Sequence, residues 1–181
     1  MRAWMIVVMA TALWLAPVSS PEDEPGALLR AAHDCGVTPH AFYVQAGAAL
    51  PAAQARAILR LLRNAWPDAE ARSAPHGGTE NLTLAAACAP DAGQARQAAR
   101  RMANLLGRGA DIRFCLTGRA DGHDMAGDAQ RALTALEDAP IEGLVQDNLV
   151  SLTGARVQVA LRRDAQGAAA LLALPLIPID Y

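Results

Sequence analysis

The chain has 181 residues and a formal net charge of −2, so it lacks the strongly basic balance by which nucleic-acid-binding domains attract phosphate backbones. Hydrophobic residues make up 52% of the sequence but aromatic residues only 4%, which predicts a core of alanine and aliphatic side chains. The sequence contains no lysine, which excludes a Walker A phosphate loop and catalysis through a lysine Schiff base.

The N-terminal segment has the features of an export signal. Arg2 is followed by an uncharged apolar run at residues 3–16, which is too short to cross a bilayer comfortably as an ordinary transmembrane helix. Residues 18–20 offer small side chains for cleavage, but Pro21 would directly follow the cut. We therefore interpret residues 1–20 as a signal peptide or an uncleaved N-terminal anchor. We expect an exported protein that is extracellular or anchored on the outer side of the cytoplasmic membrane.

Residues 21–181 suffice for one domain with a sizeable core, and none of them forms a linker-like stretch. Up to residue 109, the hydrophobic pattern predicts a helix at 24–32, a strand at 41–46, a helix that begins at Pro51, paired strands at 69–74 and 81–88, and a helix that begins at Pro90 and ends at Gly107. The two glycines at 77–78 mark the hairpin between the paired strands.

The same kinds of elements then occur again. The pattern predicts a strand at 111–117, a helix at 128–136 and three strands after it. Phe42 matches Phe114 in position, and the sequence ENLTL in the first half matches DNLVSL in the second. These matches predict two pseudo-repeats, at about residues 37–108 and 109–181.

Apolar positions at helical or strand spacing should form the core of the domain. They are Ile58, Leu61, Leu62, Met102, Leu133, Leu136, Val157, Val159 and Leu161. The last three alternate with more polar residues, which is typical of a strand with one buried face and one wetter face.

The C-terminal part has the most distinctive pattern. The sequence EGLVQDNLVSLT at 142–153 precedes the alternating strand VQVALR, a turn at 163–167 and the closing sequence LPLIPIDY at 174–181. This order resembles the YwmB family of exported bacterial proteins, for which no activity is established. The resemblance implies a TATA-box-binding-protein-like α+β fold for residues 21–181. Its two similar halves, βαββα and then βαβββ, would share one curved antiparallel sheet with the helices packed on one face.

A TATA-box-binding protein bends DNA with a basic concave sheet and paired phenylalanines that enter between base steps. In this chain, Phe42 and Phe114 lie at strand centres, where we expect them to be core residues. Around the helix at 128–136, several acidic side chains face the single basic Arg131. We therefore expect no nucleic-acid partner, whatever the name of the fold.

The common catalytic arrangements are missing from the sequence. Ser73 and Ser151 do not lie in a G-x-S-x-G elbow, and the G-R-G sequence at 107–109 follows a helix rather than a strand. His33 and Cys35 have the side-chain types of a Cys–His pair, but near neighbours at a helix end rarely face each other. We expect Cys35 to be a small buried thiol, and we predict no catalytic residue and no cofactor.

Asp121, His123, Asp124 and Asp128 are the candidate metal ligands. Carboxylates and an imidazole this close in sequence would hold a divalent cation if the loop folded back on itself. In the other interpretation, Asp121 or Asp124 caps the following helix and Asp128 lies in its first turn, where negative charge is favoured. We expect these residues to form a helix start and not a metal site. The alternative function that a metal site would indicate is a metal-dependent hydrolase acting on the cell wall.

The three cysteines, Cys35, Cys88 and Cys115, allow one disulfide with one free thiol, or three reduced thiols. An exported domain of this size does not need a covalent staple, so we expect no disulfide. The sequence has no C-x-x-C or C-x-H pair for a zinc site.

Arginine is concentrated on the two helices that begin at Pro51 and Pro90. The side chains concerned are Arg56, Arg60, Arg63, Arg96, Arg100, Arg101 and Arg108. If the helices lie side by side, these arginines form a cationic surface for anionic lipid head groups or wall polymers; otherwise they are ordinary solvated helix faces. We expect a non-enzymatic binding or scaffolding module of the cell envelope with a partner of this kind.

Overall fold

The computed structural model describes residues 24–107 and 109–174. The predicted export signal at residues 1–20 and the closing sequence at 175–181 lie outside these ranges. Within them, no helix is both long and apolar enough to cross a membrane.

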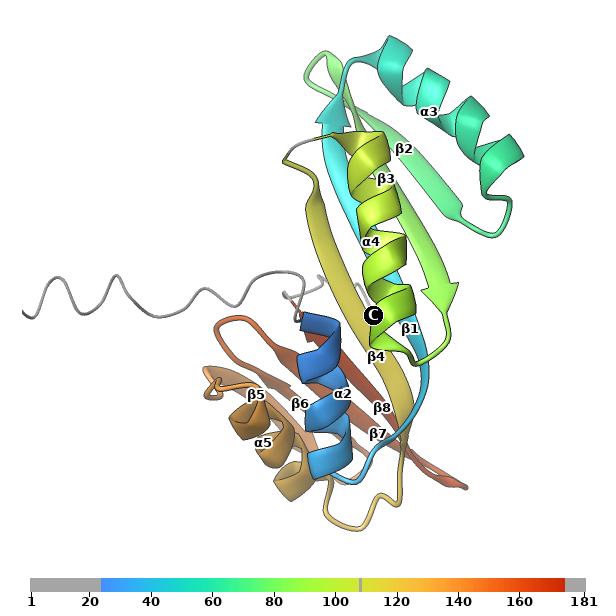
Figure 1. Cartoon of the computed structure of the whole chain (residues 1–181). Coiled ribbons are helices and arrows are strands. Elements are labelled where there is room, and N and C mark those ends of the chain that lie inside the picture. The colour runs from blue at the N-terminus through green and yellow to red at the C-terminus, as the bar shows by residue number, and fades with distance from the viewer. Residues whose placement is uncertain (1–23, 108, 175–181) are drawn as a thin grey trace, which may run out of the picture.

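The described residues form four helices and eight strands (Figure 1). The helices are α2 (Glu24–Asp34), α3 (Ala52–Ala65), α4 (Ala92–Leu106) and α5 (Met125–Ala135). The strands are β1 (Thr38–Leu50), β2 (Glu70–His76), β3 (Thr79–Cys88), β4 (Asp111–Ala120), β5 (Glu142–Gln146), β6 (Leu149–Thr153), β7 (Gln158–Asp164) and β8 (Gly167–Leu174).

All eight strands join one sheet in the order β2-β3-β1-β4-β8-β7-β6-β5. Every pairing is antiparallel. At the centre, β1 pairs with β4, so that Phe42 lies opposite Leu116 and Val44 opposite Phe114. The α+β fold class and the antiparallel sheet predicted from the sequence are therefore confirmed.

The helices pack against the sheet and against one another. α4 contacts β1, β3 and β4, whereas α5 contacts β6 and β7. α2 contacts α4, α5, β4 and β8, although it precedes β1 in the chain (Figure 1). α3 contacts β3 near the opposite end of the sheet from α5 (Figure 1). The sheet therefore has one end covered by α3 and α4 and another covered by α2 and α5.

The core lies between the sheet and the helices. Along β1, Phe42 and Val44 are fully buried, whereas Tyr43 between them is 50% exposed. One face of the sheet is thus packed and the other is open, as the period of two along a strand requires. Phe42 and Phe114 are both core residues, which confirms that interpretation.

Most of the predicted core positions are buried. They are Ile58, Leu62, Met102, Leu133, Val157, Val159 and Leu161, while Leu136 is partly buried. The prediction for Leu61 is wrong, because this side chain is 52% exposed. The buried stripe of α3 runs through Ala55, Ile58 and Leu62, and Leu61 lies on its flank.

The second half has one strand more than predicted. The first half follows the predicted order βαββα, but after α5 come the four strands β5 to β8 instead of three, so the order βαβββ is wrong. β5 and β6 form a tight hairpin around Asp147 and Asn148. β7 ends at Asp164 and β8 begins at Gly167, so the turn predicted at 163–167 lies between these two strands.

Candidate functional site

α3 carries three arginines on its solvent side. Arg56, Arg60 and Arg63 are all exposed, and their spacing of four and three residues aligns them along the helix. Arg56 Nε donates a hydrogen bond to the carbonyl of Ala52 at 3.1 Å. Among the residues that the structure describes, none of the three forms an ion pair. Their positive charges therefore face the solvent without a carboxylate partner in the described part of the chain.

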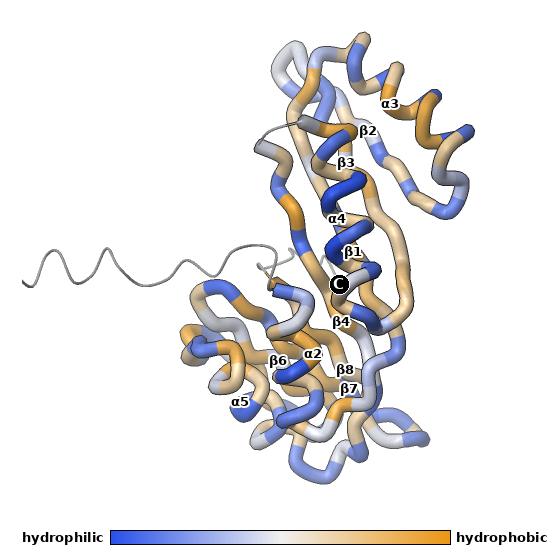
Figure 2. The backbone as a smooth tube through the Cα atoms, viewed as in Figure 1, coloured by the Kyte–Doolittle hydropathy of each residue, from blue (hydrophilic) through white to orange (hydrophobic). Residues whose placement is uncertain are grey.

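α4 is a capped helix that lies close to the sheet. The Asp91 carboxylate accepts a hydrogen bond from the backbone N–H of Gln94 at 2.8 Å, which caps its N-terminus. At the other end, Gly107 has a φ of 90°, a conformation that favours glycine. Its buried side consists of Ala95, Ala98, Ala99, Met102 and Leu106. Figure 2 shows that strongly hydrophilic residues also occur along α4.

One arginine of α4 connects this helix to α3. Nη2 of Arg101 donates a hydrogen bond to the carbonyl of Ala65 at 2.7 Å, and its guanidinium carbon lies 4.5 Å from the centroid of the Trp66 ring. The hydrogen bond and the cation–π contact hold the end of α3 against α4. Arg96 is half-buried and Arg100 is exposed, and both take part in further interactions. Arg108, the last of the seven predicted arginines, lies outside the described residues. The other six divide into a solvent-facing stripe on α3 and a more constrained set on α4.

Trp66 lies between two hollows in the surface. The larger, of about 440 Å³, is lined by Trp66, Ala87, Cys88, Gln94, Gln97, Ala98 and Arg101. The smaller, of about 280 Å³, is lined by Leu59, Leu62, Arg63, Trp66, Pro67, Ala69 and Ala71. The sequence analysis missed Trp66, because a single tryptophan after a helix has no periodic partner that would mark it. Its indole and the neighbouring guanidinium groups form the most distinctive polar and aromatic surface of α3 and α4.

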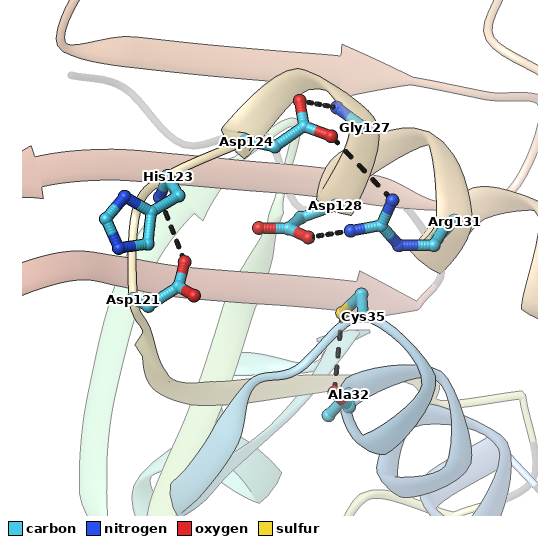
Figure 3. A network of polar contacts seen from close by, with 8 residues as sticks. All are labelled: Ala32, Cys35, Asp121, His123, Asp124, Gly127, Asp128 and Arg131. Carbon is cyan, nitrogen blue, oxygen red and sulfur yellow. Dashed lines mark hydrogen bonds and ion pairs between the residues drawn. The ribbon is translucent and has the colours of Figure 1, made fainter.

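The candidate metal ligands do not converge on a common point. Asp121 Oδ1 accepts a hydrogen bond from the backbone N–H of His123 at 2.9 Å, and Asp124 Oδ1 accepts one from the N–H of Gly127 at 3.0 Å. Figure 3 shows the His123 ring turned away from Asp128. In the described ranges, no group of three or more His, Cys, Asp or Glu side chains is placed to hold a metal ion. The interpretation of this loop as a helix start with Asp128 in the first turn is confirmed, and of the two candidate caps, Asp121 and Asp124, it is Asp124 that caps the helix.

Asp128 is a buried charge, with 6% of its surface exposed. It pairs with Nη2 of Arg131, whose other terminal nitrogen lies 3.8 Å from Asp124 Oδ2 (Figure 3). Burial raises the pKa of the Asp128 carboxyl, and the charge of Arg131 offsets part of this effect. Cys35 lies nearby, is 3% exposed, and donates from Sγ to the carbonyl of Ala32 at 3.4 Å. Burial also raises the pKa of this thiol, which disfavours the nucleophilic thiolate and confirms the small buried thiol that the sequence predicts.

Cys35, Cys88 and Cys115 are all free thiols. Burial raises the pKa of Cys88 and raises that of Cys115 to about 12. Each cysteine therefore stays protonated at neutral pH and behaves as a small apolar side chain.

The sequence analysis also missed the role of Asp138. Its carboxylate accepts hydrogen bonds from the backbone N–H groups of Ala139 at 2.9 Å, Ala155 at 3.0 Å, Arg156 at 2.8 Å and Val157 at 3.1 Å. Partial burial would raise the pKa of Asp138, but these hydrogen bonds outweigh it and hold the pKa below its ordinary range. The carboxylate thereby fixes the loop between β6 and β7, which is a structural role and not a catalytic one.

The comparisons with known proteins assign no family. No family model and no curated protein matches this chain. Among solved structures, the chain is similar to the ligand-free regulatory subunit of aspartate kinase from Thermus thermophilus. The identity is 11%, the match covers 77% of this chain and 89% of that chain, and the TM-score is 0.26. A similarity at this level carries no argument about function.

Proposed function

We propose that this chain is an exported cell-envelope protein of the YwmB type that binds a phosphate-bearing anionic surface without catalysing a reaction. The solvent-facing stripe of Arg56, Arg60 and Arg63 carries the proposal, because no ion pair within the described ranges neutralises these three charges. Guanidinium groups donate several hydrogen bonds in a fixed plane that matches phosphate oxygens. Arg101 supports the stripe indirectly, since it holds the end of α3 against α4.

The pattern of charge along α3 suits a flat anionic surface better than a small ligand. The three arginines are spread along two turns of one helix, and the exposed Leu61 lies on the same helix. Each basic residue near an anionic lipid surface contributes about 1 kcal/mol, and this contribution decreases with salt. The stripe therefore supports lipid head groups as the first partner to test, with phosphate-rich wall polymers as the second.

Vesicle binding tests the proposal directly. The protein should sediment with phosphatidylglycerol vesicles at low salt and be released as the salt rises, and it should ignore phosphatidylcholine vesicles. Replacing Arg56, Arg60 and Arg63 by glutamate should weaken binding by about a hundredfold, as the loss of about 1 kcal/mol per residue predicts.

The matched control replaces three exposed arginines elsewhere by glutamate. Arg30, Arg72 and Arg162 lie on α2, β2 and β7 and give the same change in net charge. Binding that falls equally in both variants would mean that net charge, not the stripe on α3, controls association. Unchanged binding in the first variant would refute the proposal. Retention on isolated cell wall but not on vesicles would assign the surface to wall polymers.

We further propose that the fold derives from two related halves of the kind found in TATA-box-binding proteins. Two observations support this proposal. The order helix–strand–helix–strand–strand occurs from α2 to β3 and again from α4 to β6, and the strands β1 and β4 pair at the centre of the sheet. The second half would then carry β7 and β8 as additional strands.

Export rests on the sequence of residues 1–20. A reporter enzyme fused after Glu24 should be active only outside the cytoplasm, because the uncharged run after Arg2 would carry it through the membrane. Activity of the reporter in the cytoplasm would contradict export. Mass spectrometry of the N-terminus would show whether Pro21 prevents cleavage.

A further inference from the structure

β5 is an edge strand that is exposed along its whole length. All five residues from Glu142 to Gln146 are exposed, and Leu144 and Val145 have 46% and 62% of their surface accessible. Ile141, directly before the strand, is 75% exposed. Among the residues that the structure describes, only β6 pairs with β5, so alternate N–H and C=O groups on the outer side of β5 have no strand partner there. Soluble proteins rarely leave an apolar edge of this kind uncovered.

The opposite edge of the sheet has the protection that β5 lacks. β2 carries the charged Glu70 and Arg72, and Pro75 near its end has no N–H to donate. Charged side chains and proline on an edge strand prevent pairing with other strands. β5 contains neither proline nor a basic residue, and Glu142 is its single charge. The two edges therefore differ in whether they can accept a further strand.

We propose that β5 pairs in antiparallel fashion with β5 of a second copy of this chain and forms a two-fold symmetric dimer. The sequence of the strand is compatible with itself in this arrangement. When Leu144 lies opposite its own copy, Gly143 lies opposite Val145 and Glu142 opposite Gln146. No like charges then face each other, and the two leucines form a cross-strand apolar pair.

The neighbouring strand makes room for this pairing. The Leu152 side chain of β6 passes across Gly143, where its Cδ2 atom would lie 2.7 Å from an added Cβ. Because Gly143 has no side chain, nothing separates Leu152 from the residue opposite Gly143 in the second copy. That residue is Val145, which can therefore pack against Leu152. Leu152 is a partly buried residue that already packs against the core. The contact would extend the core across the dimer interface.

A second copy is the occupant that the two edges favour. Pairing of β5 with β2 of another molecule would build an open chain of subunits, but Pro75 and the charges of β2 oppose it. Pairing of β5 with itself uses the same surface on both subunits and closes after two copies. The arginine stripe of α3 stays free, because α3 lies at the β2 end of the sheet. This inference is therefore independent of the proposed function.

Introducing a charge at Leu144, which lies opposite its own copy in the proposed dimer, tests the dimer. The full chain should sediment at twice the monomer mass in analytical ultracentrifugation. Leu144→Lys and Leu144→Glu should each raise the dissociation constant by about tenfold or more, since each places like charges opposite each other. An equimolar mixture of the two variants should recover the dimer, because lysine then faces glutamate.

The matched control is Leu61→Lys, which adds the same charge at an exposed leucine on α3. This variant should dimerise like the unmodified chain, and circular dichroism should show that all variants are folded. A monomeric unmodified chain would overturn the proposal. A dimer that survives Leu144→Lys, or a mixture that stays monomeric, would overturn it as well, because association would then not involve this register of β5.

Discussion

The two ends of the sheet use their charged side chains in opposite ways. At the β2 end, Arg56, Arg60 and Arg63 of α3 face the solvent without a carboxylate partner in the described ranges. At the β5 end, Asp138 binds four backbone N–H groups and Asp128 is buried against Arg131. The three exposed arginines of the first end are available to a ligand, whereas these two aspartates of the second end maintain the fold.

The edges of the sheet show the reverse distribution. β2 has charged residues and a proline along its edge, whereas β5 exposes apolar side chains. At the β5 end, the side chains of Asp128 and Asp138 are bonded within the fold and the exposed edge strand is apolar. This apolar edge suits contact with another protein subunit. A single sheet thus carries a cationic surface at one end and an apolar edge at the other.

Separating the two ends of the sheet by truncating the chain should have the largest effect on folding. A fragment of residues 24–107 keeps α2 to α4 but removes β4, so it bares the inner edge of β1 and the face of α2 that contacts β4, β8 and α5. We expect this fragment to aggregate or to lack a cooperative unfolding transition. Circular dichroism and sedimentation measure this outcome. A soluble fragment that unfolds cooperatively would show that the two ends are independent domains.

Among substitutions of charged residues, removing the Asp138 carboxylate should cause the largest loss of stability. Asp138→Ala leaves four backbone N–H groups without their acceptor, so the free energy of unfolding should fall by about 2 to 4 kcal/mol. Urea unfolding measures this change. Asp121→Ala is the control, because Asp121 accepts one backbone N–H and should lose about 1 kcal/mol or less. Equal effects at both positions would contradict the role of Asp138.

At the β2 end, Arg101 should matter for stability more than the arginine stripe does. Arg101→Ala removes the hydrogen bond to Ala65 and the contact with Trp66, so we expect a loss of about 1 to 2 kcal/mol. Arg60→Ala should change stability by less than about 0.5 kcal/mol, as for an ordinary surface substitution. Thermal unfolding of both variants measures the difference. A larger loss for Arg60→Ala would mean that the stripe is structural.

The smallest expected effect is the contribution of Asp138 and Asp128 to the pH dependence of stability. The lowered pKa of Asp138 stabilises the fold above about pH 4, the ordinary pKa of an aspartate, and this stabilisation is lost as the pH falls through the lower folded pKa. The raised pKa of Asp128 has the opposite sign: its contribution favours the fold at low pH and is lost as the pH rises through the folded value.

Substitution by asparagine distinguishes the contributions of Asp138 and Asp128 to the pH dependence of stability. As the pH rises from about 3 to 6, Asp138→Asn should become progressively less stable relative to the unmodified chain, and Asp128→Asn progressively more stable. Urea unfolding at several pH values measures both trends. If both variants show the same trend, either the pKa of Asp138 is not lowered or the pKa of Asp128 is not raised in the folded protein.

The parts of this structure that depend on local sequence could be predicted. The helix start at the loop of Asp121 to Asp128 and the burial of Phe42 and Phe114 follow from residue type and spacing, whereas the choice of Asp124 over Asp121 as the cap does not. Leu61 could not be placed correctly, because two adjacent leucines both fit a helical stripe and only packing on the sheet selects Leu62.

The contacts that position the candidate site depend on long-range packing. Arg101 and Ala65 are 36 residues apart in sequence, and Asp138 and Val157 are 19 apart. No sequence period connects such pairs, so neither the tie between α3 and α4 nor the carboxylate that holds the β6–β7 loop could be predicted. The arginines themselves could be found, because their spacing on a predicted helix is a local property.

Hydrogen exchange with and without phosphatidylglycerol vesicles tests the division between the two ends most directly. Amide exchange in α3 should slow when vesicles are added at low salt, and this effect should disappear at high salt. Exchange in β5 should not change with vesicles. Slowed exchange in β5 together with unchanged exchange in α3 would contradict this division, because the anionic surface would then be bound by the apolar edge and not by the arginine stripe.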